Sequence, residues 1–334
     1  MTVSELCLGT MTWGTQSTES EAHDQISMAV DHGVSFLDTA EMYPTNPVSA
    51  DTKGDTEAII GSYLAKGGRD RLVIATKITG EGSAVTGGLP ITPARMRQAV
   101  EESLVRLKTD YIDLYQMHWP NRGSYHFRKI WGYEPPTDKA PIEAEMLAIL
   151  RECKALQDEG KVRHFGLSND SVWGAAAWLR LADLHGLPRM MTVQNEYSLL
   201  CRQFDSDWAE FAALEDMPLL GYSPLATGLL TGKYAGDVVP AGSRRERTPE
   251  LGGRISPFVF EAVSAYLGIA KEHGLDPAHL ALAFYRSRPY PCLPIIGATT
   301  LKQLKINLES VNVSLSQDVL DDIAHVRRQF PAPY

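Results

Sequence analysis

Short apolar runs alternate with longer amphipathic segments along nearly the whole chain of 334 residues. Short runs rich in β-branched residues indicate strands, and apolar residues spaced three or four positions apart indicate helices. Strands that alternate with helices favour a parallel sheet, because each helix returns the chain to the edge where the next strand begins. Eight strands are predicted, at residues 6–8, 35–37, 72–76, 112–117, 162–167, 192–194, 219–222 and 292–296.

The predicted helices have recognisable starts. Thr18 and Glu21 fit a capping box, and Thr92 stands directly before Pro93 at the start of an amphipathic segment. Eight strands that alternate with helices close most naturally into a (β/α)8 TIM barrel, an α/β fold. The later helices are predicted near residues 142–159, 171–185, 206–215, 257–272, 277–287, 300–310 and 316–330.

An open doubly wound sheet is the rival architecture, and it would carry a G-x-G-x-x-G motif in its first strand-to-helix turn. The turn from Gly9 to Gly14 does not fit that motif. No linker or internal repeat separates two cores, so residues 1–334 are expected to form a single domain. Long loops at 121–141 and 231–254 follow the fourth and seventh strands, at the rim where barrels place their active sites.

Composition argues against several kinds of partner. A net charge of −9 with 22% charged residues gives no basic surface for nucleic acid or anionic lipid. The start of the chain has no signal-peptide pattern, and no run approaches the ~18 apolar residues of a membrane span. The four cysteines are scattered, so no metal site is expected. We therefore expect a cytoplasmic protein without a membrane partner, as a monomer or a homo-oligomer.

Four polar residues stand at or just beyond the ends of three consecutive predicted strands. Asp38 and Tyr43 follow the second strand, Lys77 follows the third and His118 follows the fourth. Because the carboxyl ends of parallel strands share one edge of a barrel, we expect these side chains to converge. A carboxylate, a phenol, an amine and an imidazole are together the parts of a proton-relay site.

Seven short stretches have a distinctive order and spacing. They are residues 33–43, 75–77, 110–120, 160–169, 194–195, 222–225 and 294–299. Taken together they resemble the successive signatures of the aldo-keto reductases, and the resemblance spans nearly the whole chain. The variants at residues 40–44 and 118–120 most resemble the Tas-type bacterial branch of that family.

The chemistry expected of the four residues is carbonyl reduction by hydride transfer. A carbonyl that receives hydride develops negative charge on oxygen, so Tyr43 would serve as proton donor if its pKa of ~10 is drawn down. Lys77 would stabilise the phenolate, and Asp38 would keep Lys77 charged and oriented. His118 would donate a hydrogen bond to the carbonyl oxygen. The resemblance implies the same four roles.

The resemblance implies NADPH as the cofactor, with NADH less favoured. Ser168, Asn169 and Gln194 would hold the nicotinamide amide, and Tyr222 would stack on the ring. Arg254 belongs to a basic cluster that would supply a cation for the 2′-phosphate. Further cofactor contacts are expected from Ser223, Leu225, Gly228 and Lys233 along the pyrophosphate, from Gly297 and Thr299 at a second anion site, and from Gln303 and Asn307 at the adenine end.

Aromatic residues near the expected site indicate an apolar substrate pocket. Trp119 follows His118 directly, and Trp131 and Tyr133 lie in the long loop after the fourth strand. With Trp13 they are expected to form the walls of the pocket. Such a pocket suits a small-molecule carbonyl substrate, an aldehyde or a ketone.

Two other functions fit a barrel of this kind. The first is a cofactor-sensing or regulatory binding protein with weak reductase activity, which the presence of all four catalytic residue types disfavours. The second is a metal-dependent hydrolase, which needs about three protein ligands on strand ends. Only His118 and Asp38 qualify as such ligands, so metal hydrolysis is disfavoured as well.

Overall fold

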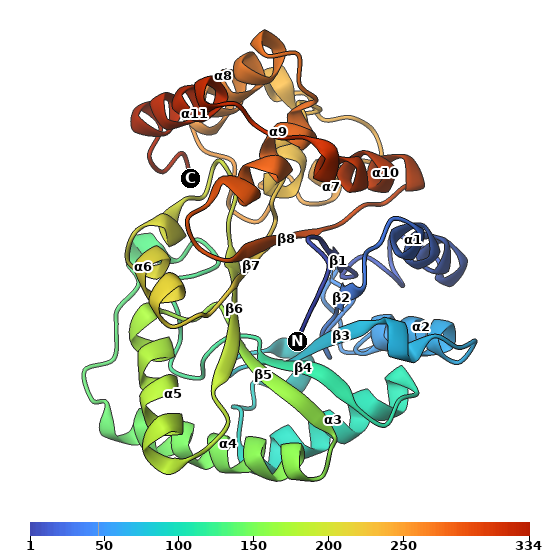
Figure 1. The fold of residues 1–334 in the computed structure, drawn as a ribbon, viewed down its shortest axis with the longest axis vertical. Helices are drawn as coiled ribbons and strands as arrows, with labels where there is room; N and C mark the ends of the chain where they lie inside the picture. Colours follow the sequence, from blue (N-terminus) through green and yellow to red (C-terminus); the bar gives the residue numbers. More distant parts are fainter. Residues whose placement is uncertain (46) are drawn as a thin grey trace. The chain divides into compact units, whose positions relative to one another are not determined.

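Eight strands close into a barrel in the computed structural model, which describes residues 1–45 and 47–334 (Figure 1). The barrel follows chain order, and the pairings from β1 to β6 and between β7 and β8 are parallel. The predicted TIM barrel is therefore confirmed. The strands are β1 (Cys7–Gly9), β2 (Phe36–Asp38), β3 (Val73–Ile78), β4 (Ile112–Met117), β5 (Val162–Ser168), β6 (Met190–Glu196), β7 (Leu219–Tyr222) and β8 (Cys292–Ile296).

Helices separate the strands along the chain, and long loops follow the fourth and seventh strands as predicted. Residues 118–139 separate β4 from the next α-helix, and the segment after β7 contains only short helices before Val259. The α-helices are α1 (Glu19–Asp31), α2 (Asp55–Leu64), α3 (Pro93–Leu107), α4 (Ala140–Asp158), α5 (Val172–His185), α6 (Asp207–Leu214), α7 (Arg244–Arg247), α8 (Val259–Glu272), α9 (Pro277–Ala283), α10 (Leu301–Glu309) and α11 (Gln317–Gln329).

Both predicted helix starts are present. Thr18 and Glu21 form the capping box of α1, and the Thr92 side chain accepts a hydrogen bond from a backbone N–H in the first turn of α3. Such acceptors satisfy amides that a helix itself leaves unpaired. Helix α2 is absent from the predicted helices, and its start explains why. It follows Gly54, which has no capping side chain and a left-handed φ of 87°, so the local signal is missing.

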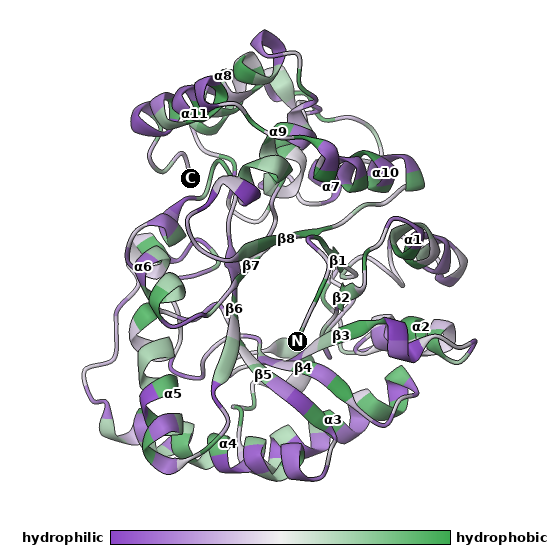
Figure 2. Cartoon of the chain, in the orientation of Figure 1, coloured by the Kyte–Doolittle hydropathy of each residue, from purple (hydrophilic) through white to green (hydrophobic). Residues whose placement is uncertain are grey.

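The core consists of the strands and the inner faces of the helices. All six residues of β4 are buried. In α4 the buried residues Met146, Ile149, Leu150 and Cys153 recur three or four positions apart, which places them on one face. Figure 2 shows both colours on α4, whereas β8 is mainly green. Buried strands of this kind give a rigid frame for the polar residues at their ends.

Internal contacts divide the chain into two compact units. The first unit is Met1–Gln194 with Thr299–Leu301, and the second is Asn195–Ala298 with Lys302–Tyr334. The four residues of the expected proton relay all belong to the first unit. The assignment of residues 1–334 to a single domain stays a prediction. Within the described part of the chain, no helix has both the length and the apolar character needed to cross a lipid bilayer.

Candidate active site

A buried ion pair joins the ends of β2 and β3. Lys77 Nζ donates to Asp38 Oδ2 at 2.6 Å and to the Thr39 carbonyl oxygen at 2.7 Å. The Lys77 side chain is fully buried and that of Asp38 is 3% exposed. Burial alone would lower the pKa of Lys77, but Asp38, together with Tyr43 and Cys7, holds that pKa above its ordinary value. Lys77 is therefore a buried cation at neutral pH.

Tyr43 and His118 lie beside this cation. Lys77 Nζ is 5.0 Å from the centroid of the Tyr43 ring. The rings of Tyr43 and His118 are 5.9 Å apart between centroids and meet edge to face at 77°. Both residues are less than a tenth exposed. The structure thus brings together the four residues that the sequence predicts at this edge.

His118 is held as a neutral imidazole. Its backbone N–H donates to the Ile78 carbonyl oxygen at 2.8 Å, which extends the pairing of β4 with β3 by one residue. Burial, and then the charge of Lys77, hold the pKa of His118 well below its ordinary value. Among the described residues, the buried Nδ1 atom has no hydrogen-bond partner. A neutral imidazole keeps one N–H, so it can donate one hydrogen bond to a bound molecule.

Two glutamine side chains hold the other oxygen of Asp38. Gln194 Nε2 donates to Asp38 Oδ1 at 2.8 Å, and Gln116 Nε2 donates to the same oxygen at 3.1 Å. The sequence did not single out Gln116, because a polar residue within an apolar strand carries no signal of its own. Gln116 could have been predicted from its position one residue before Met117, the last residue of β4. Together with Lys77 these amides fix the orientation of the carboxylate.

Ser168, Asn169 and Gln194 form a polar cluster at the ends of β5 and β6. Ser168 Oγ donates to the Gln194 carbonyl oxygen at 2.9 Å. Asn169 Nδ2 donates to the His118 carbonyl oxygen at 2.9 Å and to Ser168 Oγ at 3.0 Å. The amide N–H groups of both Asn169 and Gln194 are thus used within the protein. Side-chain carbonyl and hydroxyl oxygens can accept hydrogen bonds from the amide group of a nicotinamide, so this set of acceptors fits the cofactor that the sequence predicts.

The four aromatic residues predicted for the substrate pocket occupy different environments. The Trp119 ring lies 5.0 Å from the His118 ring between centroids, and Trp119 Nε1 donates to the Glu81 carbonyl oxygen at 2.9 Å. Trp13 is fully buried and donates to Gln25 of α1 at 3.1 Å. Trp131 is 77% exposed and Tyr133 packs edge to face on Tyr125, 6.0 Å between centroids. Only Trp119 is brought directly to His118.

In the second unit, the predicted pyrophosphate segment has an unusual backbone. Ser223, Ala226 and Thr227 have positive φ angles of 54°, 46° and 56°, and Gly228 has a φ of 100°. The φ of Gly228 is one that residues with a side chain rarely adopt, and a Cβ there would lie 2.5 Å from Cε of Lys233, so the Lys233 side chain lies close against Gly228. The segment follows Tyr222, the last residue of β7, and it contains the predicted residues Ser223, Leu225, Gly228 and Lys233. Within it, Gly228 and Lys233 lie close together.

Arg254, also in the second unit, is a buried ion-pair partner. Its Nε donates to Glu196 Oε1 at 2.8 Å, and its Nη1 donates to the Leu251 carbonyl oxygen at 2.8 Å. Its Nη2 reaches Ser223 Oγ at 3.4 Å. Burial would lower the pKa of Arg254, but Glu196, together with Tyr334 and Tyr222, raises that pKa above its ordinary value. The structure therefore places Arg254 next to Ser223, with much of its guanidinium engaged inside the protein.

The remaining predicted cofactor residues follow β8. Asn307 Nδ2 donates to the Gly297 carbonyl oxygen at 3.2 Å, which connects α10 to the end of β8. Gln303 lies on the same helix as Asn307. Thr299 belongs to the first unit. The structure thus brings Gly297 and Asn307 together in the second unit.

A parallel barrel with a buried lysine–carboxylate pair, a tyrosine and a neutral histidine at its strand ends defines a class of protein. It is a barrel enzyme with buried titratable groups gathered at its strand ends. Buried titratable groups with displaced pKa values are typical of catalytic sites.

Comparison with known proteins identifies the family. A sequence model described as "Aldo/keto reductase family" matches residues 5–328. Protein tas of Escherichia coli (strain K12) is 44% identical over 99% of this chain and 96% of its own length. The oxidoreductase YrpG of Bacillus subtilis (strain 168), described as uncharacterized, is 31% identical over 99% of this chain and 93% of its own length. An aldo-keto reductase of Babesia bovis is 34% identical over 73% and 91%. The chain belongs to the aldo/keto reductase family.

Family membership defines the general activity. The protein is an NAD(P)-dependent oxidoreductase that acts on small carbonyl compounds. The resemblance that the sequence motifs indicated is therefore confirmed.

Proposed function

We propose that this protein reduces an aldehyde or a ketone to an alcohol with NADPH, and that Tyr43 is the general acid. The observation that carries the proposal is the buried, charged Lys77 beside the Tyr43 ring, with Asp38 as its counter-ion. A cation in this position favours the phenolate that remains after Tyr43 has given up its proton. The same geometry is of little use for binding alone.

The roles of the residues follow from the charge that develops on the substrate. When bound, the reduced nicotinamide supplies a hydride to the carbonyl carbon. The Tyr43 hydroxyl gives its proton to the carbonyl oxygen, and Lys77 stabilises the phenolate until a proton returns. His118 donates a hydrogen bond to the same oxygen, which orients the substrate and stabilises the developing negative charge. Trp119 supplies apolar surface beside His118.

NADPH is preferred to NADH in this proposal because basic residues are concentrated after β7. Lys233, Arg244, Arg245 and Arg247 all lie between β7 and α8. Arg245 is paired with Asp237. We assign Lys233, Arg244 and Arg247 to the phosphates because they lie in the segment that follows Tyr222 at the end of β7. Ser168, Asn169 and Gln194 would hold the nicotinamide amide.

The test is cofactor binding followed by turnover. Quenching of tryptophan fluorescence gives the dissociation constants for NADPH and NADH, and loss of NADPH absorbance with 4-nitrobenzaldehyde gives the rate. We expect NADPH to bind more tightly, and Tyr43→Phe to lower kcat by about 10²- to 10⁴-fold, the usual contribution of a general acid. The dissociation constant for NADPH should stay unchanged in the variant.

Each other result has a definite meaning. A protein that binds neither nucleotide would contradict the proposal at its base. Tight binding without turnover of any aldehyde or ketone would favour the cofactor-sensing function. Full activity in Tyr43→Phe would assign the proton to another group.

A further inference from the structure

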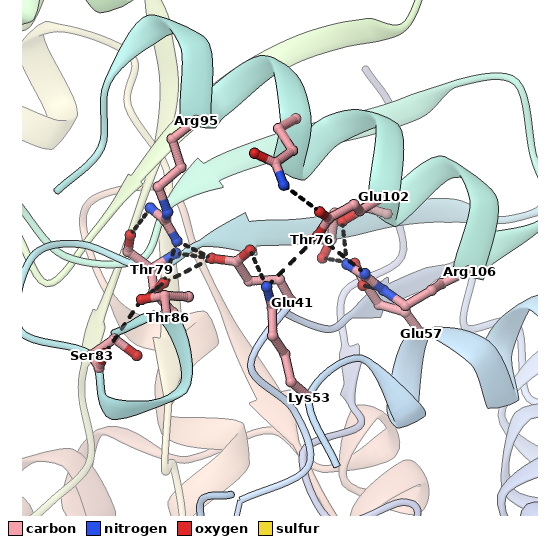
Figure 3. A network of polar contacts seen from close by, with 12 residues as sticks. Glu41, Lys53, Glu57, Thr76, Thr79, Ser83, Thr86, Arg95, Glu102 and Arg106 are labelled. Atoms are coloured by element: carbon pink, nitrogen blue, oxygen red, sulfur yellow. Dashed lines mark hydrogen bonds and ion pairs between the residues drawn. The ribbon is translucent and has the colours of Figure 1, made fainter. Parts of the chain in front are cut away.

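A buried cluster of polar side chains gathers around Glu41, Thr79 and Arg95 (Figure 3). At its centre is Glu41, two residues before Tyr43, whose carboxylate is 1% exposed. Glu41 Oε1 accepts from the Thr79 N–H at 2.7 Å, from Thr79 Oγ1 at 2.8 Å and from Arg95 Nη2 at 2.6 Å. Arg95 Nη1 donates to the Thr79 carbonyl oxygen at 2.5 Å. Glu41, Thr79 and Arg95, here called the Glu41 cluster, therefore contact one another, and Lys53 Nζ lies 3.7 Å from Glu41 Oε2 at the edge of the cluster.

The Glu41 cluster links the two segments that carry the proton donor and its cation. Thr79 comes two residues after Lys77, just as Glu41 comes two residues before Tyr43. The backbone supports the same link, since the Glu41 N–H donates to the Lys77 carbonyl oxygen at 3.1 Å. The Tyr43 N–H donates to the Ala40 carbonyl oxygen at 3.0 Å, so Tyr43 is only one tight turn away from this attachment. Arg95 ties both segments to α3.

Stability alone is a poor reason for a charged group at this place. Removing a carboxylate from water costs several kcal/mol, and replacement of a buried ion pair by apolar residues is often neutral or stabilising. A reactive group, by contrast, has to be held accurately, because a displacement of about 1 Å can cost about 10²-fold in rate. A charged acceptor with three short donors defines the position of the chain more closely than apolar packing does.

We propose that Glu41, held by Thr79 and Arg95, is a positioning residue that fixes the Tyr43 hydroxyl relative to Lys77 and to the substrate carbonyl. This inference rests on the proposed role of Tyr43 as general acid. Glu41 touches neither Lys77 Nζ nor the Tyr43 ring in any contact of the cluster, so it acts through the backbone between residues 41 and 43.

A second buried carboxylate in the same region provides a matched control. Glu57 of α2 is fully buried, accepts from Thr76 Oγ1 at 2.6 Å and pairs with Arg106 Nε at 2.7 Å. Figure 3 shows it with Arg106 on the far side of Lys53 from Arg95. Its contacts lie on α2, β3 and α3 and do not include the segment from Glu41 to Tyr43. Neutralising Glu57 should therefore destabilise the fold without moving Tyr43.

The experiment compares Glu41→Gln with Glu57→Gln in the full-length protein. We expect both to lower the unfolding temperature, and Glu41→Gln alone to lower kcat, by about 10-fold or more for a displacement of less than 1 Å. The dissociation constant for NADPH should stay within about twofold of wild type in both variants, since neither carboxylate belongs to the predicted cofactor residues. Equal losses of kcat in the two variants would overturn the proposal.

The double variant with Tyr43→Phe tests whether Glu41 acts through Tyr43. If it does, Glu41→Gln has no further effect on the residual turnover of Tyr43→Phe, because the group that it positions is gone. An undiminished effect in that background would show that Glu41 acts elsewhere. Should Glu41→Gln not fold, Thr79→Val keeps the branched shape and the backbone N–H and removes the hydroxyl, with its hydrogen bonds to Glu41, Arg95 and Thr86. A smaller loss of kcat in the same direction is then expected, and no loss would count against the proposal.

A cavity beside the Glu41 cluster allows a test by chemical rescue. It has a volume of about 150 Å³ and is lined by Glu41, Lys53, Arg95 and Glu102, among others. In Arg95→Ala this space grows, and millimolar methylguanidinium should restore part of the lost kcat while leaving wild type unchanged. Absence of rescue at saturating concentration, with the protein folded, would argue that the Arg95 contact does not set the rate.

A readout without activity separates this inference from the proposed function. If the wild type reduces no carbonyl compound, the proposed function fails, but the position of Tyr43 can still be followed. Protein labelled with 3-fluorotyrosine gives ¹⁹F resonances, and Tyr43→Phe identifies the resonance of Tyr43. We expect Glu41→Gln to shift or broaden that resonance and Glu57→Gln to leave it in place. An unshifted resonance in Glu41→Gln would overturn the inference on its own.

Discussion

Lys77 is a buried cation whose stability depends on its immediate partners. Its ammonium group is fully buried, and it donates short hydrogen bonds to the Asp38 carboxylate and to the Thr39 carbonyl oxygen. A buried ion is tolerated only when it is paired and hydrogen-bonded, so each partner depends on the other. Substitution of one partner should therefore affect stability and catalysis together.

Lys77→Met removes the cation and leaves the Asp38 carboxylate buried without its partner. We expect the free energy of unfolding to fall by about 3–5 kcal/mol, measured by urea denaturation. Turnover should fall by at least about 10²-fold, because no cation then stabilises the Tyr43 phenolate. The double variant Lys77→Met with Asp38→Asn should recover much of the stability and none of the turnover. Retained turnover in Lys77→Met would contradict the role given to the cation.

A single site residue can be predicted from the sequence when its position at the end of an apolar run already marks it. Asp38, Lys77 and His118 end apolar runs, and their convergence follows from the parallel barrel. Gln116 and Glu41 carry no such signal, although Glu41 lies within a recognised motif. A glutamate in a loop is normally solvated, and only the approach of Arg95 from α3 shows that this one is buried.

At the scale of elements, helices α2 and α3 approach each other closely. Gly61 of α2 faces the end of α3, and a Cβ at Gly61 would lie 2.1 Å from the Arg106 carbonyl oxygen. That oxygen belongs to a helix backbone, which cannot move aside cheaply. The missing side chain thus allows the contact between the two helices that carry Glu57 and Arg95.

Gly61→Ala should destabilise the protein even though alanine favours helices. Alanine gains up to about 1 kcal/mol in helix propensity, but overpacking of this kind typically costs about 1–3 kcal/mol. Gly268→Ala in α8 is the control, since a Cβ there meets no atom within 4 Å. We expect the control to be neutral or slightly stabilising in thermal unfolding. A stabilised Gly61→Ala would mean that α2 and α3 can separate without loss.

At the scale of the whole molecule, His118 makes stability depend on pH. Its pKa in the folded protein is well below the ordinary value, because of burial and then Lys77. Below about pH 6.5 the unfolded chain binds a proton at this residue that the folded protein does not bind. Stability is therefore complete above about pH 6.5 and falls as the pH drops towards the folded pKa.

The measurement compares wild type with His118→Gln, which cannot bind this proton. We expect the free energy of unfolding of wild type to fall relative to the variant by up to about 1.4 kcal/mol per pH unit below pH 6.5. Between pH 7 and 8 the difference between the two proteins should stay constant. Parallel curves from pH 5 to 8 would contradict the neutral buried imidazole.

The order of the barrel could be predicted because it depends on local patterns. Apolar runs, helix caps and their alternation act over a few residues, and eight repeats of strand and helix leave few ways to fold. The same regularity places Asp38, Lys77 and His118 at one edge, and the motif order indicates the family. Helix α2 was not predicted from the sequence, because no capping residue marks its start after Gly54.

Contacts between distant segments were decided by the tertiary structure. Burial lowers the pKa of both Lys77 and His118, and the neighbouring Asp38 carboxylate acts against that effect at Lys77. Both effects arise only after neighbouring segments have excluded water, so the spacing of the residues in the sequence does not specify the charge on Lys77 or the neutrality of His118. The pairing of Arg254 with Glu196 and that of Arg95 with Glu41 join residues 58 and 54 positions apart. Long-range electrostatics of this kind depends on distances of a few ångströms, which a linear pattern does not specify.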